Sequence, residues 1–485
     1  MNAPAQTALS PAPFDRKEAE RFLMDALGRA LEQRTVAVVR FPAPRAPADA
    51  MLRALRRDTA IAWRPPEGPE LSAHGAAATL SLRGDDRFED LKRESAALFA
   101  ELQRVTHPDA PLAAPRLFGG FSFAVGGASQ LPWRGFGDGR FFLARWTYER
   151  GASPTLTYAA DLRDGWAGRL SLARAELGAV WDALVSPAPE TPPPSVVRVD
   201  HLSPERWRAQ IDAITDAIAR GEFEKVVAAR RTEVRTDRDL DAWAILRGLG
   251  ARYPETWRFG LRFGQSTFLA ATPERLFVKR GRLVETDALA GSIAANGEDA
   301  EARLLASAKD QREHRPVVEH LQARLGPLCT QLDAPDAPQL RRMPNILHLH
   351  TQLRGHLRAE VHAADLASAL HPTPAVGGVP AEAAVQWIAA QEAHPRGWYA
   401  GPVGWLDADG DADFAVALRC GVIQGANAWA WAGGGIVEGS EPDAEWQESA
   451  LKLRPFTHAL GVEEQQVEEQ QVEEQHVDDD ADRPT

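Results

Sequence analysis

The chain has 485 residues, 44% hydrophobic and 25% charged, a composition typical of globular proteins and a length sufficient for a large core. No apolar stretch approaches the ~20 residues that cross a bilayer, and no secretory signal is recognisable, so we expect no membrane contact. The net charge of −13 argues against nucleic acid only weakly, because the last residues carry most of it. Cys329 and Cys420 are too few for a disulfide framework, which favours the reducing cytoplasm.

Five segments follow one another along the chain. Residues 1–14, rich in Ala and Pro, predict a disordered lead-in, and residues 15–186 alternate apolar runs with turn signals, which predicts strands with some helices. Residues 187–195 form a proline-rich extended connector. Residues 196–460 hold nearly all the motifs. Residues 461–485 repeat a five-residue acidic unit that cannot build a core, which indicates a disordered tail, with an interaction tail as the alternative.

Regular elements are predicted most clearly after the connector. Ser203-Pro204 combines an N-cap hydroxyl with proline at the first helical position, which predicts a helix starting there. Apolar runs predict strands over 225–230, 267–270 and 414–420. Helices and strands in this order indicate an α/β or α+β protein with large sheets.

Lys225 and Glu274 are candidates for acid–base chemistry. Lys225 opens an apolar strand, so it is either a solvated strand end or an amine whose burial keeps it neutral enough to act as a base. Glu274 follows the strand 267–270 and is either a helix N-terminal acid or a general acid. A hydroxyl exchange needs one group of each kind.

Three further carboxylates could bind a metal ion. Glu313 lies in a helical stretch that begins near residue 298. Glu445 and Glu448 are three apart on one helix face, with Lys452 one turn further. A surface salt bridge between Glu448 and Lys452 is one interpretation, and hard oxygen ligands suited to Mg²⁺ are the other.

Glycines and two cationic or polar side chains suggest anion binding. Gly291 and the run 433–435 mark either tight turns or nests of backbone N–H groups that hold a carboxylate. Arg419 is expected to project from the strand 414–420, and a buried guanidinium needs a partner such as a carboxylate. His348 alternates with apolar residues and is either a core histidine or a catalytic one.

Ordered motifs over residues 203–456 resemble the chorismate-utilising enzymes, which include isochorismate, salicylate, anthranilate and aminodeoxychorismate synthases. The matching motifs begin at Lys225, Thr272, Thr286, Ala308, Leu370, Trp398, Ala417, Ala432 and Glu445. The resemblance implies a single large α/β (α+β) unit of two similar halves, with two packed sheets and helices outside. It also implies a monomer.

The resemblance assigns roles within the site. It implies Mg²⁺ held by Glu313 and Glu448, with Glu445 close by, and the ring carboxylate of chorismate on the metal. Substrate contacts are implied for Gly291, His348, Ala375, Tyr399, Arg419, Gly433, Gly434, Gly435 and Lys452. Pro316 departs from the family pattern and predicts a kink in the helix that carries Glu313.

Lysine at 225 together with alanine at 290 is similar to the water-using members of the family. The resemblance therefore implies an isochorismate synthase in which Lys225 deprotonates water for attack at C2, and Glu274 protonates the departing C4 hydroxyl. No amidotransferase subunit is expected. A salicylate synthase, or a non-catalytic homologue that only binds a partner, is the alternative.

Overall fold

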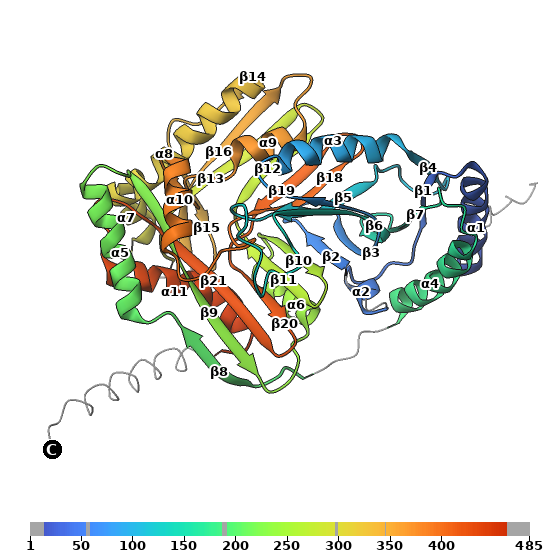
Figure 1. The fold of residues 1–485 in the computed structure, drawn as a ribbon, viewed down its shortest axis with the longest axis horizontal. Helices are drawn as coiled ribbons and strands as arrows, with labels where there is room; N and C mark the ends of the chain where they lie inside the picture. The colour runs from blue at the N-terminus through green and yellow to red at the C-terminus, as the bar shows by residue number, and fades with distance from the viewer. Residues whose placement is uncertain (1–13, 55–58, 187–191, 296–298, 345, 463–485) are drawn as a thin grey trace, which may run out of the picture.

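The computed structural model describes residues 14–54, 59–186, 192–295, 299–344 and 346–462 (Figure 1). The predictions for residues 1–13 and for the tail from residue 463 lie outside the described residues, as does most of the proline-rich connector. None of the described helices has the length and apolar character needed to span a bilayer. The cytoplasmic location and the monomeric state stay predictions.

Runs of consecutive strands are interspersed with helices along the chain. Before the connector they are α1 (Arg16–Gln33), β1 (Val36–Pro42), α2 (Ala50–Ala54), β2 (Thr59–Arg64), β3 (Glu70–Leu82), α3 (Arg87–Ala100), β4 (Leu102–Thr106), β5 (Arg116–Phe121), β6 (Gly139–Arg150), β7 (Thr155–Asp161) and α4 (Gly168–Val185). After it come β8 (Val196–His201), α5 (Pro204–Ala219), β9 (Lys225–Thr236), α6 (Ala242–Arg252), β10 (Trp257–Phe263), β11 (Ser266–Thr272), β12 (Arg275–Arg280), β13 (Leu283–Ala294), α7 (Ala300–Ala306) and α8 (Ala308–Leu325). The remainder comprises a 3-10 turn (Gly326–Leu328), β14 (Cys329–Asp333), β15 (Gln339–Arg342), β16 (Ile346–Leu357), α9 (Ala363–Leu370), β17 (Gly378–Val379), α10 (Ala381–Gln391), β18 (Pro402–Asp407), β19 (Ala412–Val416), β20 (Cys420–Gln424), β21 (Asn427–Ile436) and α11 (Pro442–Ala459).

Hydrogen bonds join the strands into one branched sheet. The branch point is β6, which pairs with β3, β5 and β7. One arm runs from β6 through β3, β2, β10, β11, β20 and β21 to β9. The other runs from β6 through β5, β18, β19, β12 and β13 to β16. The predicted α/β class is confirmed, and the two expected sheets are arms that remain continuous through β6.

The two arms face each other across the main hydrophobic core. Phe142 of β6 lies 6.0 Å from Phe263 of β10, measured between ring centroids. The indole Nε1 of Trp257, on β10, donates to Asp413 Oδ1 on β19 at 3.1 Å. Helices lie outside the arms, with α5 and α11 beside β9 and β21, and α8 beside β13 and β16 (Figure 1).

Helix α5 starts where the sequence predicts. The Ser203 hydroxyl accepts from the Arg206 N–H at 3.4 Å, and Pro204 is the first helical residue. The buried side of the helix presents Trp207 and Ile211 to the core. The strands predicted over 225–230 and 267–270 are also confirmed, as parts of β9 and β11.

The strand predicted over 414–420 is confirmed for residues 414–416 and wrong for residues 417–419. β19 ends at Val416 and β20 begins at Cys420, because the chain crosses here from one arm to the other. Arg419 lies in the crossing with φ 49°, a left-handed conformation rare for a side chain of its size. Helix α8, in contrast, continues through Pro316 to Leu325, so the proline does not end it.

Candidate active site

A cavity opens between the ends of the two arms. It gathers most of the predicted site residues from both arms and from α8 and α11. Its lining includes Glu274, Glu313, His348, Ala375, Tyr399, Arg419, Gly433, Gly434, Gly435 and Lys452. The other four, Lys225, Gly291, Glu445 and Glu448, adjoin these lining residues.

Lys225 lies at the start of β9 and is fully buried. Its Nζ donates to the backbone oxygen of Glu313 at 3.3 Å and lies 3.4 Å from Glu313 Oε1. Burial lowers the pKa of Lys225, although the neighbouring carboxylate of Glu313 opposes the shift. The lysine is therefore not a solvated strand end, and its environment favours a neutral amine.

Glu274 occupies the turn between β11 and β12 and is 2% exposed. Its backbone N–H donates to the Thr272 hydroxyl, which fixes the turn. The Oε1 atom is buried and has no hydrogen-bond partner among the described residues. Burial raises the pKa of Glu274 to about 8, so the group retains its proton at neutral pH and can donate it.

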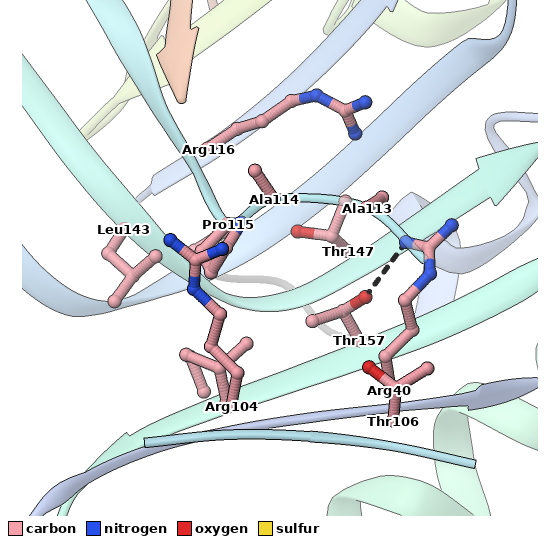
Figure 2. Close-up of a pocket in the computed structure, with 13 residues that line it drawn as sticks. Arg40, Arg104, Thr106, Ala113, Ala114, Pro115, Arg116, Leu143, Thr147 and Thr157 are labelled. Carbon is pink, nitrogen blue, oxygen red and sulfur yellow. Dashed lines mark hydrogen bonds between the residues drawn. The ribbon is translucent and has the colours of Figure 1, made fainter. Parts of the chain in front are cut away.

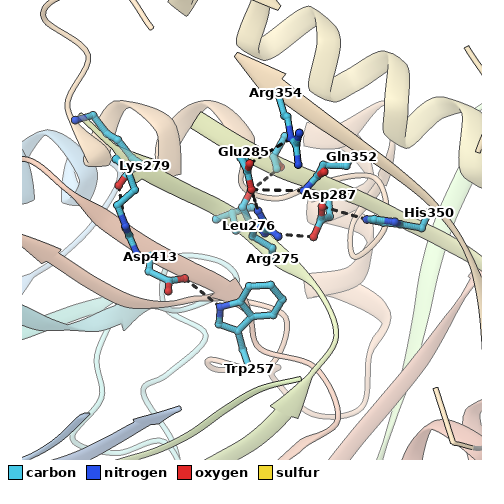
Figure 3. A network of polar contacts seen from close by, with 12 residues as sticks. Trp257, Arg275, Leu276, Lys279, Glu285, Asp287, His350, Gln352, Arg354 and Asp413 are labelled. Atoms are coloured by element: carbon cyan, nitrogen blue, oxygen red, sulfur yellow. Dashed lines mark hydrogen bonds and ion pairs between the residues drawn. The ribbon is translucent and has the colours of Figure 1, made fainter. Parts of the chain in front are cut away.

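A second buried carboxylate, Asp287 on β13, stands in a different environment (Figure 3). His350 Nε2 lies 3.1 Å from its Oδ1, and Arg275 Nε and Arg341 Nη1 lie 3.3 and 3.4 Å from its Oδ2. Burial alone would raise the pKa of Asp287, but these cationic neighbours lower it. Asp287 therefore stays ionised and ties β12, β15 and β16 together beside Glu274.

The three predicted metal ligands each have a lysine partner. Besides the pair of Lys225 and Glu313, Lys309 Nζ lies 2.7 Å from Glu445 Oε1, and Lys452 Nζ lies 2.5 Å from Glu448 Oε1. The other oxygen of Glu445, Oε2, is buried and has no hydrogen-bond partner within the described part of the chain. In that same part, no three His, Cys, Asp or Glu side chains converge as a ready metal site.

Gly433 to Gly435 do not form a backbone nest. They lie inside β21 and pair with Ala229, Ala228 and Val227 of β9, so the prediction of a nest is wrong. A Cβ on Gly435 would come within 2.5 Å of both Lys225 Cε and Glu313 Oε1, and one on Gly434 would lie 3.0 Å from Glu445 Oε2. Gly435 therefore leaves room for two charged side chains, whereas a Cβ on Gly433 would meet the backbone oxygen of Ala228 at 2.2 Å.

Arg419 and His348 both line the cavity and contact each other. Arg419 Nη2 lies 3.3 Å from His348 Nε2, and the Ser292 hydroxyl lies 2.8 Å from His348 Nδ1. Among the described residues no carboxylate lies within ion-pair distance of Arg419, whose pKa is lowered by burial. The nearby ring of Tyr399 stacks on Trp431. This buried guanidinium is available to an anionic ligand.

Gly291 and Ala375 contribute no polar side chain to the site. Gly291 sits at a bulge where the pairing of β13 with β16 shifts register, and its φ of 76° suits glycine. Ala375 lines the cavity next to Val376. Their contacts with a substrate stay predictions.

Lys309, Asp287 and Ser292 were not assigned roles from the sequence. Lys309 is four residues before Glu313, a spacing that predicts a pair on the same helix, but its partner is Glu445 on α11. Asp287 gave a usable signal, because it directly precedes the apolar run Ala288-Leu289-Ala290, and a carboxylate buried there needs partners. Ser292 offered no signal of its own.

The family model described as chorismate binding enzyme matches residues 25–461, nearly the whole chain. The chain belongs to this family. The family match extends into the N-terminal half, where the motifs are loose, and spans both arms of the sheet.

Similar proteins include several isochorismate synthases. The salicylate biosynthesis isochorismate synthase of Pseudomonas aeruginosa is 37% identical over 418 residues, covering 84% of this chain and 86% of that protein. The isochorismate synthase MenF of Bacillus subtilis is 32% identical, covering 78% of this chain and 80% of its own. The solved structure of MenF, the menaquinone-specific isochorismate synthase from Escherichia coli, has a TM-score of 0.74 at 28% identity, covering 92% of this chain and 100% of that one.

Proposed function

We propose that this protein is an isochorismate synthase, an isomerase that converts chorismate to isochorismate. The observation that carries the proposal is the pair of buried groups at one cavity, Lys225 with a lowered pKa and Glu274 with a raised one. Environments that push a base and an acid in opposite directions are typical of acid–base catalysis. The names of the similar proteins support the same reaction.

In the proposed reaction Lys225, as the neutral amine, removes a proton from water as its oxygen attacks C2 of the ring. Both ring double bonds shift in the same step, and Glu274 delivers its proton to the hydroxyl that leaves C4. Arg419 and Tyr399 hold the enolpyruvyl carboxylate, and His348 faces the ring. Because Lys225 Nζ contacts Glu313 and has no exposed surface, the substrate-bound enzyme must open this contact for water to reach the amine.

The acidic cluster fits Mg²⁺ in the chemistry of its donors. Glu313, Glu445 and Glu448 offer only carboxylate oxygens, which are the ligands Mg²⁺ prefers, and Glu445 Oε2 has no protein partner among the described residues. We propose that Glu313 and Glu448 hold the ion, with Glu445 beside it, where it would neutralise the ring carboxylate of the substrate. Lys452 then keeps Glu448 oriented through their contact at 2.5 Å.

The product assay tests this proposal directly. Chorismate incubated with the protein and Mg²⁺, without any amine donor or second subunit, is expected to give isochorismate, measured by chromatography. Salicylate and pyruvate as primary products would replace the proposal by a salicylate synthase, and anthranilate formed only with ammonia would replace it by an amine-transferring enzyme. Unchanged chorismate with folded protein would favour a non-catalytic binding protein.

The Lys225→Ala variant tests the base. Turnover is expected to fall by about 10²–10⁴-fold while chorismate binding stays measurable, because general-base catalysis contributes about that factor. Lys279→Ala is a matched control, since Lys279 is also buried but donates to the Gly410 carbonyl away from the cavity. Retained turnover in Lys225→Ala would remove this lysine from the mechanism.

A further inference from the structure

A second cavity lies at a gap along the outer edge of β9. On this edge β9 pairs with β17 at Lys225 and Val226 and with β8 from Thr232 onward, so the stretch 227–231 has no strand beside it. Arg396 partly fills the gap by donating to the Val227 carbonyl at 2.8 Å. The remaining space, about 980 Å³, is bordered by β8, α5 and the segment after α10. We call it the Arg230 cavity.

Arg230 is the buried cation of this cavity, with 3% exposure. Its Nε donates to the Ser449 hydroxyl at 2.8 Å, and its guanidinium lies 3.6 Å from the ring centroid of Trp446. Burial lowers the pKa of Arg230 to about 9, so it stays charged at neutral pH. Within the described residues no carboxylate pairs with it. A buried charge without a counter-charge is costly, so a ligand that supplies one binds favourably.

Other donors in the same lining also lack acceptors. His201 Nε2 and Gln210 Nε2 are buried and have no hydrogen-bond partner in the described structure. When the Thr232 hydroxyl donates to His201 Nδ1, 2.9 Å away, the imidazole proton lies on Nε2 and can be donated to a ligand.

The acids that border the cavity are already engaged. Glu392 lies 2.5 Å from Arg396, Asp200 lies 2.6 Å from Arg198, and Glu233 pairs with Arg231. The cavity therefore has unmatched donors and, at Arg230, a buried positive charge without a carboxylate partner among the described residues. Its lining also has an apolar part, made by Leu202, Ala229, Ala393 and Trp431.

Three arginines, Arg40, Arg104 and Arg116, also line a cavity in the N-terminal half (Figure 2). Arg40 and Arg116 both contact Glu149, at 3.2 and 3.0 Å, and Arg104 contacts Asp409 at 2.9 Å. Each of these arginines has a carboxylate partner. Arg230 does not, which distinguishes its cavity as the stronger candidate for an anion site.

We propose that the Arg230 cavity is a second ligand site that binds a small ring-bearing carboxylate. The carboxylate would pair with the two Nη groups of Arg230, the edge left by the contacts to Ser449 and Trp446, and accept from His201 and Gln210. The ring would lie against the apolar part of the lining. Trp431 lines both this cavity and the active-site cavity, but none of the proposed catalytic groups belongs to the Arg230 cavity.

The test uses benzoate as the probe and calorimetry as the measurement, on full-length Arg419→Ala protein. That variant removes the guanidinium of the active-site cavity, so the binding signal does not depend on the proposed isomerase reaction. Benzoate is expected to bind with one site per chain. Arg230→Gln in the same background should weaken binding by at least about tenfold, equivalent to about 1.4 kcal/mol. Arg104→Gln, in the paired N-terminal cluster, is the control and should leave binding unchanged.

Two further measurements test the site without relying on the Arg230→Gln variant, which could fail to fold. Gln210→Leu removes one donor without removing the charge and should weaken binding less than Arg230→Gln does. A crystal soaked with 4-bromobenzoate should show bromine anomalous signal in the Arg230 cavity. No benzoate binding to Arg419→Ala protein, binding equal in all variants, bromine elsewhere only, or binding of inorganic phosphate but not benzoate would each overturn the proposal.

Discussion

Glu274 and Asp287 have the same exposure, 2%, but their pKa values are shifted in opposite directions. Asp287 has three cationic or imidazole neighbours within 3.4 Å, and its pKa is lowered. Glu274 has no hydrogen-bond partner on Oε1 among the described residues, and burial raises its pKa to about 8. Asp287 is itself one of the charges that raise the pKa of Glu274. At equal burial, the neighbouring charged groups determine whether a carboxyl is ionised and pairs with cations or keeps a proton that it can donate.

Removing the proton donor should have the largest effect. Glu274→Gln is expected to lower kcat by about 10²–10⁴-fold, the usual contribution of a general acid, when isochorismate formation is measured at saturating chorismate. The free energy of unfolding should not fall, because the neutral amide replaces a carboxyl that is already protonated. Near-normal kcat in this variant would contradict the assignment of Glu274 as the acid.

Asp287→Asn should mainly lower stability, whereas Glu274→Gln mainly lowers kcat. The change removes the carboxylate that Arg275 and Arg341 share, although Arg275 keeps its contact with Glu285, so the loss should not exceed the cost of breaking a buried ion pair, about 3–5 kcal/mol. Urea unfolding should show this loss of stability, in contrast to Glu274→Gln. Equal stability of the two variants would mean that the two carboxylates do not differ in the way described.

Glu274 and Asp287 should affect the pH dependence of stability in opposite directions, and Glu274 should also affect that of activity. Since Glu274 must hold its proton, kcat/KM should fall as the pH rises above about 8, and the residual activity of Glu274→Gln should lack this fall. Between the usual value of 4.5 and about 8, the native carboxyl keeps a proton that the unfolded chain loses, so Glu274 lowers stability as pH rises. Asp287 contributes stability above its unfolded pKa and loses it as pH falls through its lowered native pKa.

His350→Gln should have the smallest effect. It removes the neighbour 3.1 Å from Asp287 Oδ1 but leaves both arginines in place. The free energy of unfolding is expected to fall by less than about 1 kcal/mol, because His350 contacts Asp287 as an ion pair without a well-aligned hydrogen bond. A loss as large as that of Asp287→Asn would shift the main support of the carboxylate from the arginines to the histidine.

Local patterns predicted the elements well, and the crossing between arms poorly. The N-cap at Ser203 and the apolar run after Lys225 fixed α5 and the start of β9, because these signals act within a few residues. Arg419 was expected on a strand, since nothing local marks the place where the chain changes arms. Gly435 was read as part of a nest, but its absent side chain makes room for Lys225, which is distant in sequence.

Most of the predicted site residues line one cavity, whereas their partners could not be inferred from the sequence. Glu313 was proposed as a metal ligand, and the contact with Lys225 depends on packing between α8 and β9. Lys309 reaches Glu445 on another helix, although its sequence spacing suggests Glu313. Pairings across elements depend on tertiary structure, and the motif resemblance supplied the roles that spacing alone left open.

The reaction in H₂¹⁸O tests the central claim most directly. If water attacks C2 with Lys225 as base and the C4 hydroxyl leaves with the proton of Glu274, isochorismate formed from chorismate should carry one ¹⁸O at C2, measured by mass spectrometry. Isochorismate without the label would mean that the hydroxyl migrates within the substrate. That result would contradict the proposed roles of both Lys225 and Glu274.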